Sequence, residues 1–145
     1  MTKEKWKIKR ATSSGGIIYK KQKHEIKVAL CARGKGKIWC LPKGLINKNE
    51  KSEEAAKREV KEETGLAGKL IDKIGDIDYW FIFKGTKIHK VVHFYLFKYL
   101  SGSTADHDFE VDNVKWLSIN EAIKRLTYKN EAEIMKKAKR MISKS

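Results

Sequence analysis

The chain has 145 residues, of which 41% are hydrophobic and 10% aromatic, a composition that fits one globular domain spanning residues 1–145. Its formal net charge of +15 suits a polyanionic partner such as a polyphosphate or a nucleic acid, although the lysines are spread over the whole chain. No apolar run approaches the length of a membrane span, and the opening MTKEKWKIKR has no hydrophobic segment after its charges, so we expect a cytoplasmic protein rather than a membrane protein.

Strand-like sequence fills the first 41 residues. The expected segments are a strand at residues 6–19, a turn at 20–24, and a hairpin made of residues 25–32 and 37–41. Within the first strand, the run SSGG at residues 13–16 suggests a bend or a bulge. Cys31 and Cys40 lie on the two strands of the hairpin, and two thiols make neither a disulfide framework nor a zinc site, so we expect both to serve packing.

A helix is predicted after this hairpin. Ser52 is the expected N-cap because its side chain can accept from the first free amides, and Glu53 and Glu54 suit the positive end of the helix dipole. Gly65 supplies the matching C-terminal stop.

The second half of the chain returns to strands and ends in helices. The expected segments are a hairpin of residues 70–83 and 87–100, a polar loop at 101–107, a strand at 111–117, and helices at 119–126 and 130–142. Gly75 is a candidate bulge in the hairpin, and Ser118 or Asn120 is expected to cap the first of these helices. This order of elements predicts an α+β fold or a three-layer sandwich.

The helix after the first hairpin carries a cluster of carboxylates. Glu59, Glu62 and Glu63 fall within an arc of roughly 100°. Like charges at i and i+4 weaken a helix by a few tenths of a kcal/mol, and a hard divalent cation would offset that cost. The structural alternative is a solvated helix held by ion pairs such as Arg58 with Glu62.

The flanking residues favour the metal-binding interpretation. The segment matches the pattern G-x5-E-x7-R-E-U-x-E-E-x-G-U, where U is apolar, at Gly44, Glu50, Arg58, Glu59, Val60, Glu62, Glu63, Gly65 and Leu66. This pattern resembles the Nudix box. The resemblance implies an α/β fold, namely an α/β/α sandwich with a mixed β-sheet.

The resemblance also implies a metal site and its chemistry. Glu59, Glu62 and Glu63 would bind Mg²⁺, with Mn²⁺ as the alternative ion, and the carbonyl of Gly44 would face the metal. The number of ions stays open. A bound cation of this kind neutralises phosphate charge and lowers the pKa of a water molecule that attacks phosphorus.

Two further roles follow from the resemblance. Glu50 and Arg58 are expected to support the site by tying the loop to the helix. The general base is either Glu59 or Glu110, because many Nudix enzymes carry a loop glutamate before a strand that contains tryptophan, as Glu110 precedes Trp116 here. The alternative for Glu110 is one more exposed acid.

Substrate choice is expected to depend on residues outside the box. Lys43, in WCLPKG, looks like the equivalent residue of diadenosine polyphosphate and diphosphoinositol polyphosphate hydrolases, and it adds charge beside the site. The second hairpin resembles that of bacterial and asymmetric dinucleoside tetraphosphate hydrolases, in which residues matching Tyr79 and Lys90 face the polyphosphate. Trp80 is a candidate for stacking on a base. Alternation places Tyr79, Phe81 and Phe83 on one face and Trp80 and Ile82 on the other, so we expect one set to be core. His89 and His93 are expected to be satisfied strand histidines.

The sequence therefore predicts a hydrolase that cleaves a nucleotide polyphosphate, diadenosine tetraphosphate to ATP and AMP, with Mg²⁺ as cofactor. The alternatives are an RNA 5′-pyrophosphohydrolase, which the charge of +15 would suit, and a general (d)NTP pyrophosphatase. A non-catalytic nucleotide or RNA sensor is the alternative from another class, although such proteins usually lose one of the metal carboxylates. RNA ranks below a small nucleotide as partner, and the oligomeric state stays open.

Overall fold

The computed structural model describes residues 6–144. Its elements are β1 (Lys7–Gln22), β2 (Glu25–Arg33), β3 (Ile38–Cys40), β4 (Lys43–Leu45), α1 (Ser52–Thr64), β5 (Leu66–Phe83), β6 (Thr86–Gly102), a 3₁₀ turn (Thr104–Asp106), β7 (Asn113–Ser118), α2 (Ile119–Arg125) and α3 (Lys129–Ser143). Within these residues no helix is long and apolar enough to cross a membrane.

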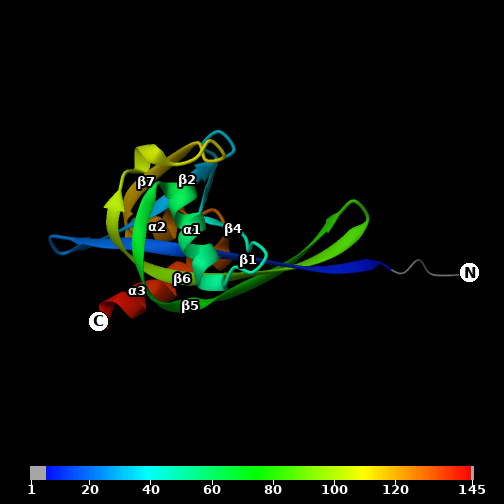
Figure 1. The fold of residues 1–145 in the computed structure, drawn as a ribbon. Coiled ribbons are helices and arrows are strands. Elements are labelled where there is room, and N and C mark those ends of the chain that lie inside the picture. The colour runs from blue at the N-terminus through cyan, green and yellow to red at the C-terminus, as the bar shows by residue number, and fades with distance from the viewer. Residues whose placement is uncertain (1–5, 145) are drawn as a thin grey trace, which may run out of the picture.

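The strands form one mixed sheet at the centre of the fold (Figure 1). The main order is β3-β2-β1-β6-β5, while β4 pairs with β1 and β7 pairs with β2. Within residues 6–144, the pairing of β1 with β6 is parallel and the other five pairings are antiparallel. The predicted mixed sheet and both predicted hairpins are confirmed, including the irregularity at Gly75, where the register of β5 shifts.

Helices cover both faces of this sheet, as the sandwich prediction requires. Consecutive residues of a strand point to opposite faces. Ile17 of β1 therefore packs in a cluster with Met135 of α3, whereas its neighbour Ile18 packs in a second cluster with Val60 of α1. All three side chains from β1 and α1 are at most 1% exposed, and Met135 is fully buried. The α/β/α prediction is confirmed.

The predicted bend or bulge at residues 13–16 is wrong. The pairing of β1 with β6 runs without a register shift from Lys7 to Tyr19. The two glycines serve close packing instead, since a Cβ at Gly15 would lie 2.3 Å from the carbonyl oxygen of Pro42, and one at Gly16 would lie 2.6 Å from the ring of Phe97. The strand also continues to Gln22, so the turn that follows is shorter than predicted.

The helix α1 begins and ends almost as predicted. Lys51, not Ser52, is the N-cap residue, and its N–H donates to Glu54 at 3.2 Å. Ser52 is already helical, and its hydroxyl group is hydrogen-bonded to that of Ser14 at 2.7 Å, which attaches the helix to β1. Gly65 ends the helix in the left-handed conformation with φ of 78°, as predicted.

The far ends of β5, β6 and β1 extend past the helices as a ribbon (Figure 1). We call residues 79–90 of the β5–β6 hairpin together with residues 7–12 of β1 the arm. The prediction that one of its two side-chain sets is core is wrong, because Trp80, Phe81, Ile82 and Phe83 are 50%, 38%, 61% and 57% exposed. Alternation was correct, and Tyr79 packs against the core cluster that includes α3. Beyond Tyr79, the aromatic residues of β5 belong to neither core cluster of the described residues.

Candidate active site

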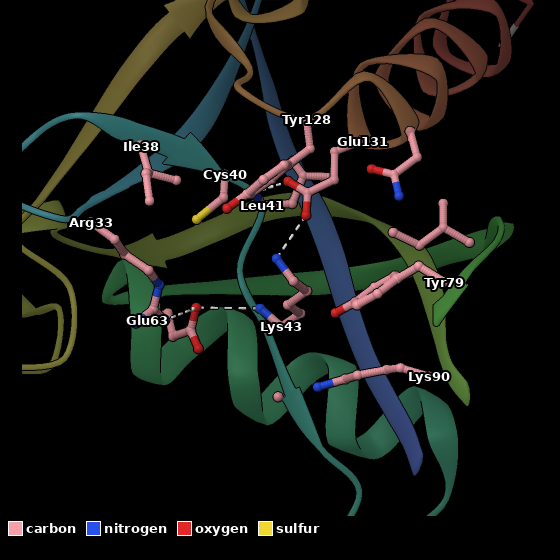
Figure 2. Close-up of a pocket in the computed structure, with 13 residues that line it drawn as sticks. Arg33, Ile38, Cys40, Leu41, Lys43, Glu63, Tyr79, Lys90, Tyr128 and Glu131 are labelled. Atoms are coloured by element: carbon pink, nitrogen blue, oxygen red, sulfur yellow. Dashed lines mark hydrogen bonds and ion pairs between the residues drawn. The ribbon is translucent and has the colours of Figure 1, made fainter. Parts of the chain in front are cut away.

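A cavity of about 610 Å³ lies beside α1 where β2, β4, β5, β6 and α3 meet (Figure 2). Its lining is Arg33, Ile38, Cys40, Leu41, Lys43, Gly44, Glu63, Ile77, Tyr79, Lys90, Tyr128, Asn130 and Glu131. Two carboxylates and three cationic side chains therefore meet apolar and aromatic ones here. A concave site of this size and mixture suits a small polar ligand with an apolar part.

Glu63 is the buried carboxylate of the cavity. Its side chain is 4% exposed, and it pairs with Arg33 Nη2 at 2.9 Å and accepts from the backbone N–H of Lys43 at 3.3 Å. Burial raises the pKa of Glu63 to about 7, because the loss of hydration outweighs the favourable charge of Arg33. A further positive charge would therefore strongly favour its ionised form.

Glu59 lies against Gly44. Its side chain is 12% exposed, Arg58 Nη1 donates to it at 2.8 Å, and burial raises its pKa while Arg58 opposes that shift. Its carboxyl group is also close enough to that of Glu63 for a hydrogen bond. A Cβ at Gly44 would lie 2.2 Å from Cδ of Glu59, so position 44 has no room for a side chain.

Arg58 links the third box carboxylate and the loop before the helix. Glu62 is 48% exposed and meets Arg58 Nη1 at 3.3 Å, while Glu50 forms a two-point contact with Arg58 at 2.8 and 2.9 Å. The guanidinium lowers the pKa of Glu50 to about 2. Arg58 also donates to the carbonyl oxygen of Leu45 at 3.0 Å. The residues predicted to tie the loop to the helix are in contact.

These carboxylates suit a hard cation by their chemistry but face arginines in this structure. Among residues 6–144, no three His, Cys, Asp or Glu side chains are already arranged around one metal position. The three carboxylates do not converge on one point because each is paired with an arginine: Glu59 and Glu62 with Arg58, and Glu63 with Arg33. Their oxygen donors are nevertheless of the kind that Mg²⁺ prefers. The donor set fits the predicted ion, and the ion itself stays a prediction.

Glu110, the second candidate base, is not part of the cavity lining. It is exposed in the loop before β7, where its carbonyl oxygen accepts from Arg33 Nη1 at 3.1 Å and its N–H donates to Asp108 at 3.2 Å. The structure therefore places the backbone of Glu110 next to the arginine that holds Glu63. Its role as a base stays a prediction.

Three of the four predicted substrate residues line the cavity, namely Lys43, Tyr79 and Lys90. Trp80 lies on the opposite face of β5, where its ring stacks on His89 at 4.4 Å with an interplanar angle of 9°. The structure thus does not bring Trp80 together with the others. The histidines are paired as expected, His89 with Asp78 at 2.9 Å and His93 with Asp76 at 2.6 Å.

The two cavity lysines differ in what faces them. Figure 2 shows the ammonium group of Lys43 directed at Glu131, at 2.7 Å, so its charge is balanced within the protein. Burial alone would lower the pKa of Lys43, but the Glu131 carboxylate raises it. The pKa of Lys90 is lowered by burial and by the nearby charge of Lys43. The field at Lys90 therefore favours an incoming anion.

Glu131 was missed by the sequence interpretation. It is 1% exposed in the first turn of α3 and accepts from the N–H of Leu41 at 2.8 Å as well as from Lys43. One signal was available: Glu131 precedes Ile134, Met135 and Ala138 by three, four and seven positions, so it lies on the apolar face of its helix. A carboxylate on such a face needs a buried partner.

Comparisons with known proteins agree with this architecture. The family model described as NUDIX domain matches residues 9–138. The protein named MutT4 in Mycobacterium tuberculosis (strain CDC 1551 / Oshkosh) is 44% identical over 107 residues, which cover 74% of this chain and 43% of that protein. The 8-oxo-(d)GTP phosphatase of Mycolicibacterium smegmatis is 32% identical over 112 residues, which cover 77% of this chain and 33% of that protein. The chain thus spans less than half the length of these two relatives.

Solved structures share the fold at low sequence identity. An Ap4A hydrolase of C. elegans in a binary complex superposes with a TM-score of 0.71 and 22% identity, covering 93% of this chain and 99% of that one. The NUDIX domain of Shewanella oneidensis NrtR, complexed with ADP ribose, has a TM-score of 0.70 and 17% identity, with 92% and 88% covered. Since the family model covers most of the sequence and a 44% identical relative covers three quarters of it, the chain belongs to the NUDIX family.

Proposed function

We propose that the protein hydrolyses a pyrophosphate linkage in a nucleoside polyphosphate, with a nucleoside or deoxynucleoside triphosphate as the substrate. The observation that carries this proposal is the position of two carboxylates of α1 beside one cavity: Glu63 is buried in its lining, and Glu59, half-buried, lies against Gly44, which also lines it. Lys90 and Tyr79 line the same cavity. Acids on α1 together with a cation and an aromatic ring suit a phosphate chain followed by a base.

A divalent cation, Mg²⁺ with Mn²⁺ as the alternative, would be held by the side chains of Glu59, Glu62 and Glu63 and by the carbonyl oxygen of Gly44. When bound, such an ion supplies charge neutralisation of the phosphates and a more acidic water. Glu62 is the most exposed of the three carboxylates, so it can leave Arg58 at the smallest cost. Glu59 and Glu110 stay the two candidates for the base.

The remaining residues of the cavity would bind different parts of the substrate. Lys90 would meet the phosphate chain, because no carboxylate of the described residues pairs with its ammonium group, whereas Lys43 is paired with Glu131. Tyr79 and Tyr128 offer aromatic surface for the base, and the amide of Asn130 can donate to it and accept from it. The contribution of Lys43 to binding would then depend partly on its ion pair with Glu131, which fixes the position of its ammonium group.

The size of the cavity favours one nucleoside over two. A volume of about 610 Å³ lies within the range of about 300–1,000 Å³ that holds one drug-sized ligand. The second nucleoside of diadenosine tetraphosphate would lie outside it. The name of the Mycolicibacterium smegmatis relative, an 8-oxo-(d)GTP phosphatase, points to the same substrate class. We therefore place the (d)NTP pyrophosphatase ahead of the dinucleotide hydrolase that the sequence pattern predicted.

Diadenosine tetraphosphate stays the second candidate because of one observation. The three residues that resemble those of the dinucleoside tetraphosphate hydrolases, Lys43, Tyr79 and Lys90, all line the same cavity. A chain of four phosphates is longer than a triphosphate chain, and two lysines at one cavity suit that length.

A substrate panel with product analysis tests the proposal. dGTP, 8-oxo-dGTP, ATP and diadenosine tetraphosphate are incubated separately with Mg²⁺, and the products are identified. We expect faster turnover of a triphosphate than of the dinucleotide, and the reverse order would move the assignment to the second candidate. Tight nucleotide binding without metal-dependent turnover of any of the four would instead support a sensor.

Two variants tie the turnover to the carboxylates. Glu62→Gln and Glu63→Gln keep the shape of the side chain and remove its charge, so each should lower turnover by about a hundredfold or more. Glu121→Gln is the matched control, because that glutamate is 53% exposed on α2 and pairs only at 3.6 Å with Arg125. Rates near those of the unchanged protein in both box variants would exclude the proposed catalytic site.

A further inference from the structure

The arm carries an exposed aromatic row on the same face as the cavity. Alternate residues of a strand share one face, so Tyr79, Phe81 and Phe83 lie in line along β5. Tyr79 lines the cavity, its ring centroid lies 6.1 Å from that of Phe81, and exposure rises to 38% at Phe81 and 57% at Phe83. The row therefore begins at the cavity and runs outward to the tip of the hairpin.

A row of lysines runs beside the aromatic row on this face. The strand register pairs Lys9 with Ile88 and Ile88 with Phe81, and one step outward it pairs Lys7 with Thr86 and Thr86 with Phe83. Residues paired across strands point to the same face, and the strands β1 and β5 are two inter-strand spacings, or about 10 Å, apart. At the tip, the ammonium group of Lys84 lies 5.3 Å from the ring of Phe83.

The charge of the arm has one sign. Residues 7–12 and 79–90 contain the cations Lys7, Lys9, Arg10, Lys84, Lys87 and Lys90, and neither stretch contains an aspartate or a glutamate. The nearest acids of β5, Asp78 and Asp76, pair with His89 and His93. An apolar surface with this charge fits an extended polyanion that also presents flat rings.

We propose that the cavity-side face of the arm binds single-stranded nucleic acid. Proteins that bind single strands combine aromatic rings, on which successive bases stack, with a basic path for the backbone. Here Phe81 and Phe83 on β5 supply the rings, and Lys7 and Lys9 on β1, at the opposite edge of the three-stranded ribbon, supply the path. The bound bases must not be paired with a second strand, because a base inside a duplex exposes no face on which a side chain can stack.

A second copy of the chain is the other occupant that an exposed apolar ribbon suggests. The formal net charge of +15 opposes that association, and the arm has no acidic side chain with which a second arm could pair. A nucleic acid, in contrast, neutralises the cations when it binds.

Fluorescence anisotropy with a labelled, 5′-hydroxyl single strand of about twelve nucleotides tests the proposal. The measurement is made without a divalent ion, so it is independent of hydrolysis and can succeed or fail separately from the proposed function. We expect Phe81→Ala and Phe83→Ala each to weaken binding about tenfold. The double variant Lys7→Ala/Lys9→Ala should reduce the steepness of the salt dependence by about 1.4 in the slope of log K against log salt.

Ile82→Ala is the matched control, because Ile82 is 61% exposed on the opposite face of the same strand, compared with 57% for Phe83. Its affinity should equal that of the unchanged protein. Single-stranded RNA and single-stranded DNA are titrated in parallel to identify the source, with a duplex as competitor. Unchanged binding in both Phe variants, equal loss in Ile82→Ala, or preference for the duplex would overturn the proposal. A dimer in light scattering that Phe83→Ala dissolves would assign the face to a second copy instead.

Discussion

A methyl group at position 44 tests the placement of Glu59 in the active site. In Gly44→Ala the new Cβ would lie 2.2 Å from Cδ of Glu59 and 2.3 and 2.4 Å from its two oxygens, whereas ordinary contact begins at 3.4 Å. The carboxyl group must therefore move by about 1.2 Å, the difference between 3.4 and 2.2 Å. Its side chain is 12% exposed and is held by Arg58 at 2.8 Å, so it has little free space to occupy. A displacement of about 1 Å at reacting groups can cost about a hundredfold in rate.

We therefore expect kcat/KM of Gly44→Ala to fall about a hundredfold in Mg²⁺-dependent hydrolysis of the best triphosphate substrate. Gly75→Ala is the matched control, since the nearest atoms to its new Cβ lie at 3.5 Å and its activity should not change. Thermal unfolding of both variants shows whether the fold persists at the assay temperature. A folded Gly44→Ala protein with kcat/KM within about threefold of the original would refute the reasoning.

Three predictions concern stability. With a chelator present, the unfolding free energy should fall as the pH rises from 4.5 to 7, by up to about 3 kcal/mol more than in Glu63→Gln. The reason is that folded Glu63 keeps its proton to about pH 7, whereas the unfolded chain loses it near pH 4.5. Parallel pH profiles of the two proteins would contradict this. Glu131→Ala should cost about 3 kcal/mol in urea unfolding, because it leaves the half-buried ammonium group of Lys43 and the buried N–H of Leu41 without their partner, whereas exposed Glu121→Ala should change stability by less than about 0.5 kcal/mol. Gly16→Ala should cost about 1–3 kcal/mol in the same assay, since its Cβ would lie 2.6 Å from the ring of Phe97, and an unchanged midpoint would show that the ring can move.

Local patterns predicted the elements because each pattern reflects a local physical requirement. Gly65 was recognised as a helix stop because a left-handed residue closes a helix, and its φ is 78°. The long hairpin was recognised from two apolar runs around a glycine turn. The parallel pairing of β1 with β6 and the pairing of β7 with β2 were not predicted. Those pairings join segments about 80 to 90 residues apart, and no periodicity within either segment specifies its partner.

The candidate site likewise has residues that the sequence predicted and residues that only the folded structure reveals. Helical spacing placed the carboxylates of α1 on one arc, and the box pattern added Gly44, which the structure places against Glu59. Arg33 and Glu131 come from β2 and α3, and only folding brings them to the cavity. The position of Glu131 changes the interpretation of Lys43. The sequence assigned the charge of Lys43 to substrate binding, whereas in the structure its ammonium group pairs with Glu131 at 2.7 Å.

The sequence allowed two interpretations of the acidic helix, a metal site or a solvated helix with ion pairs, and two adjacent glutamates of this helix differ sharply in burial. Glu62 is 48% exposed and forms the predicted i,i+4 pair with Arg58, as a solvated helix would. Glu63, the next residue, is 4% exposed and carries a pKa near 7 because its charge is poorly hydrated. One residue along a helix turns the side chain by about 100°, so adjacent glutamates meet water and protein interior respectively. Of these two adjacent acids, Glu63 is the one whose ionised form burial disfavours, and a cation in the cavity would stabilise that form.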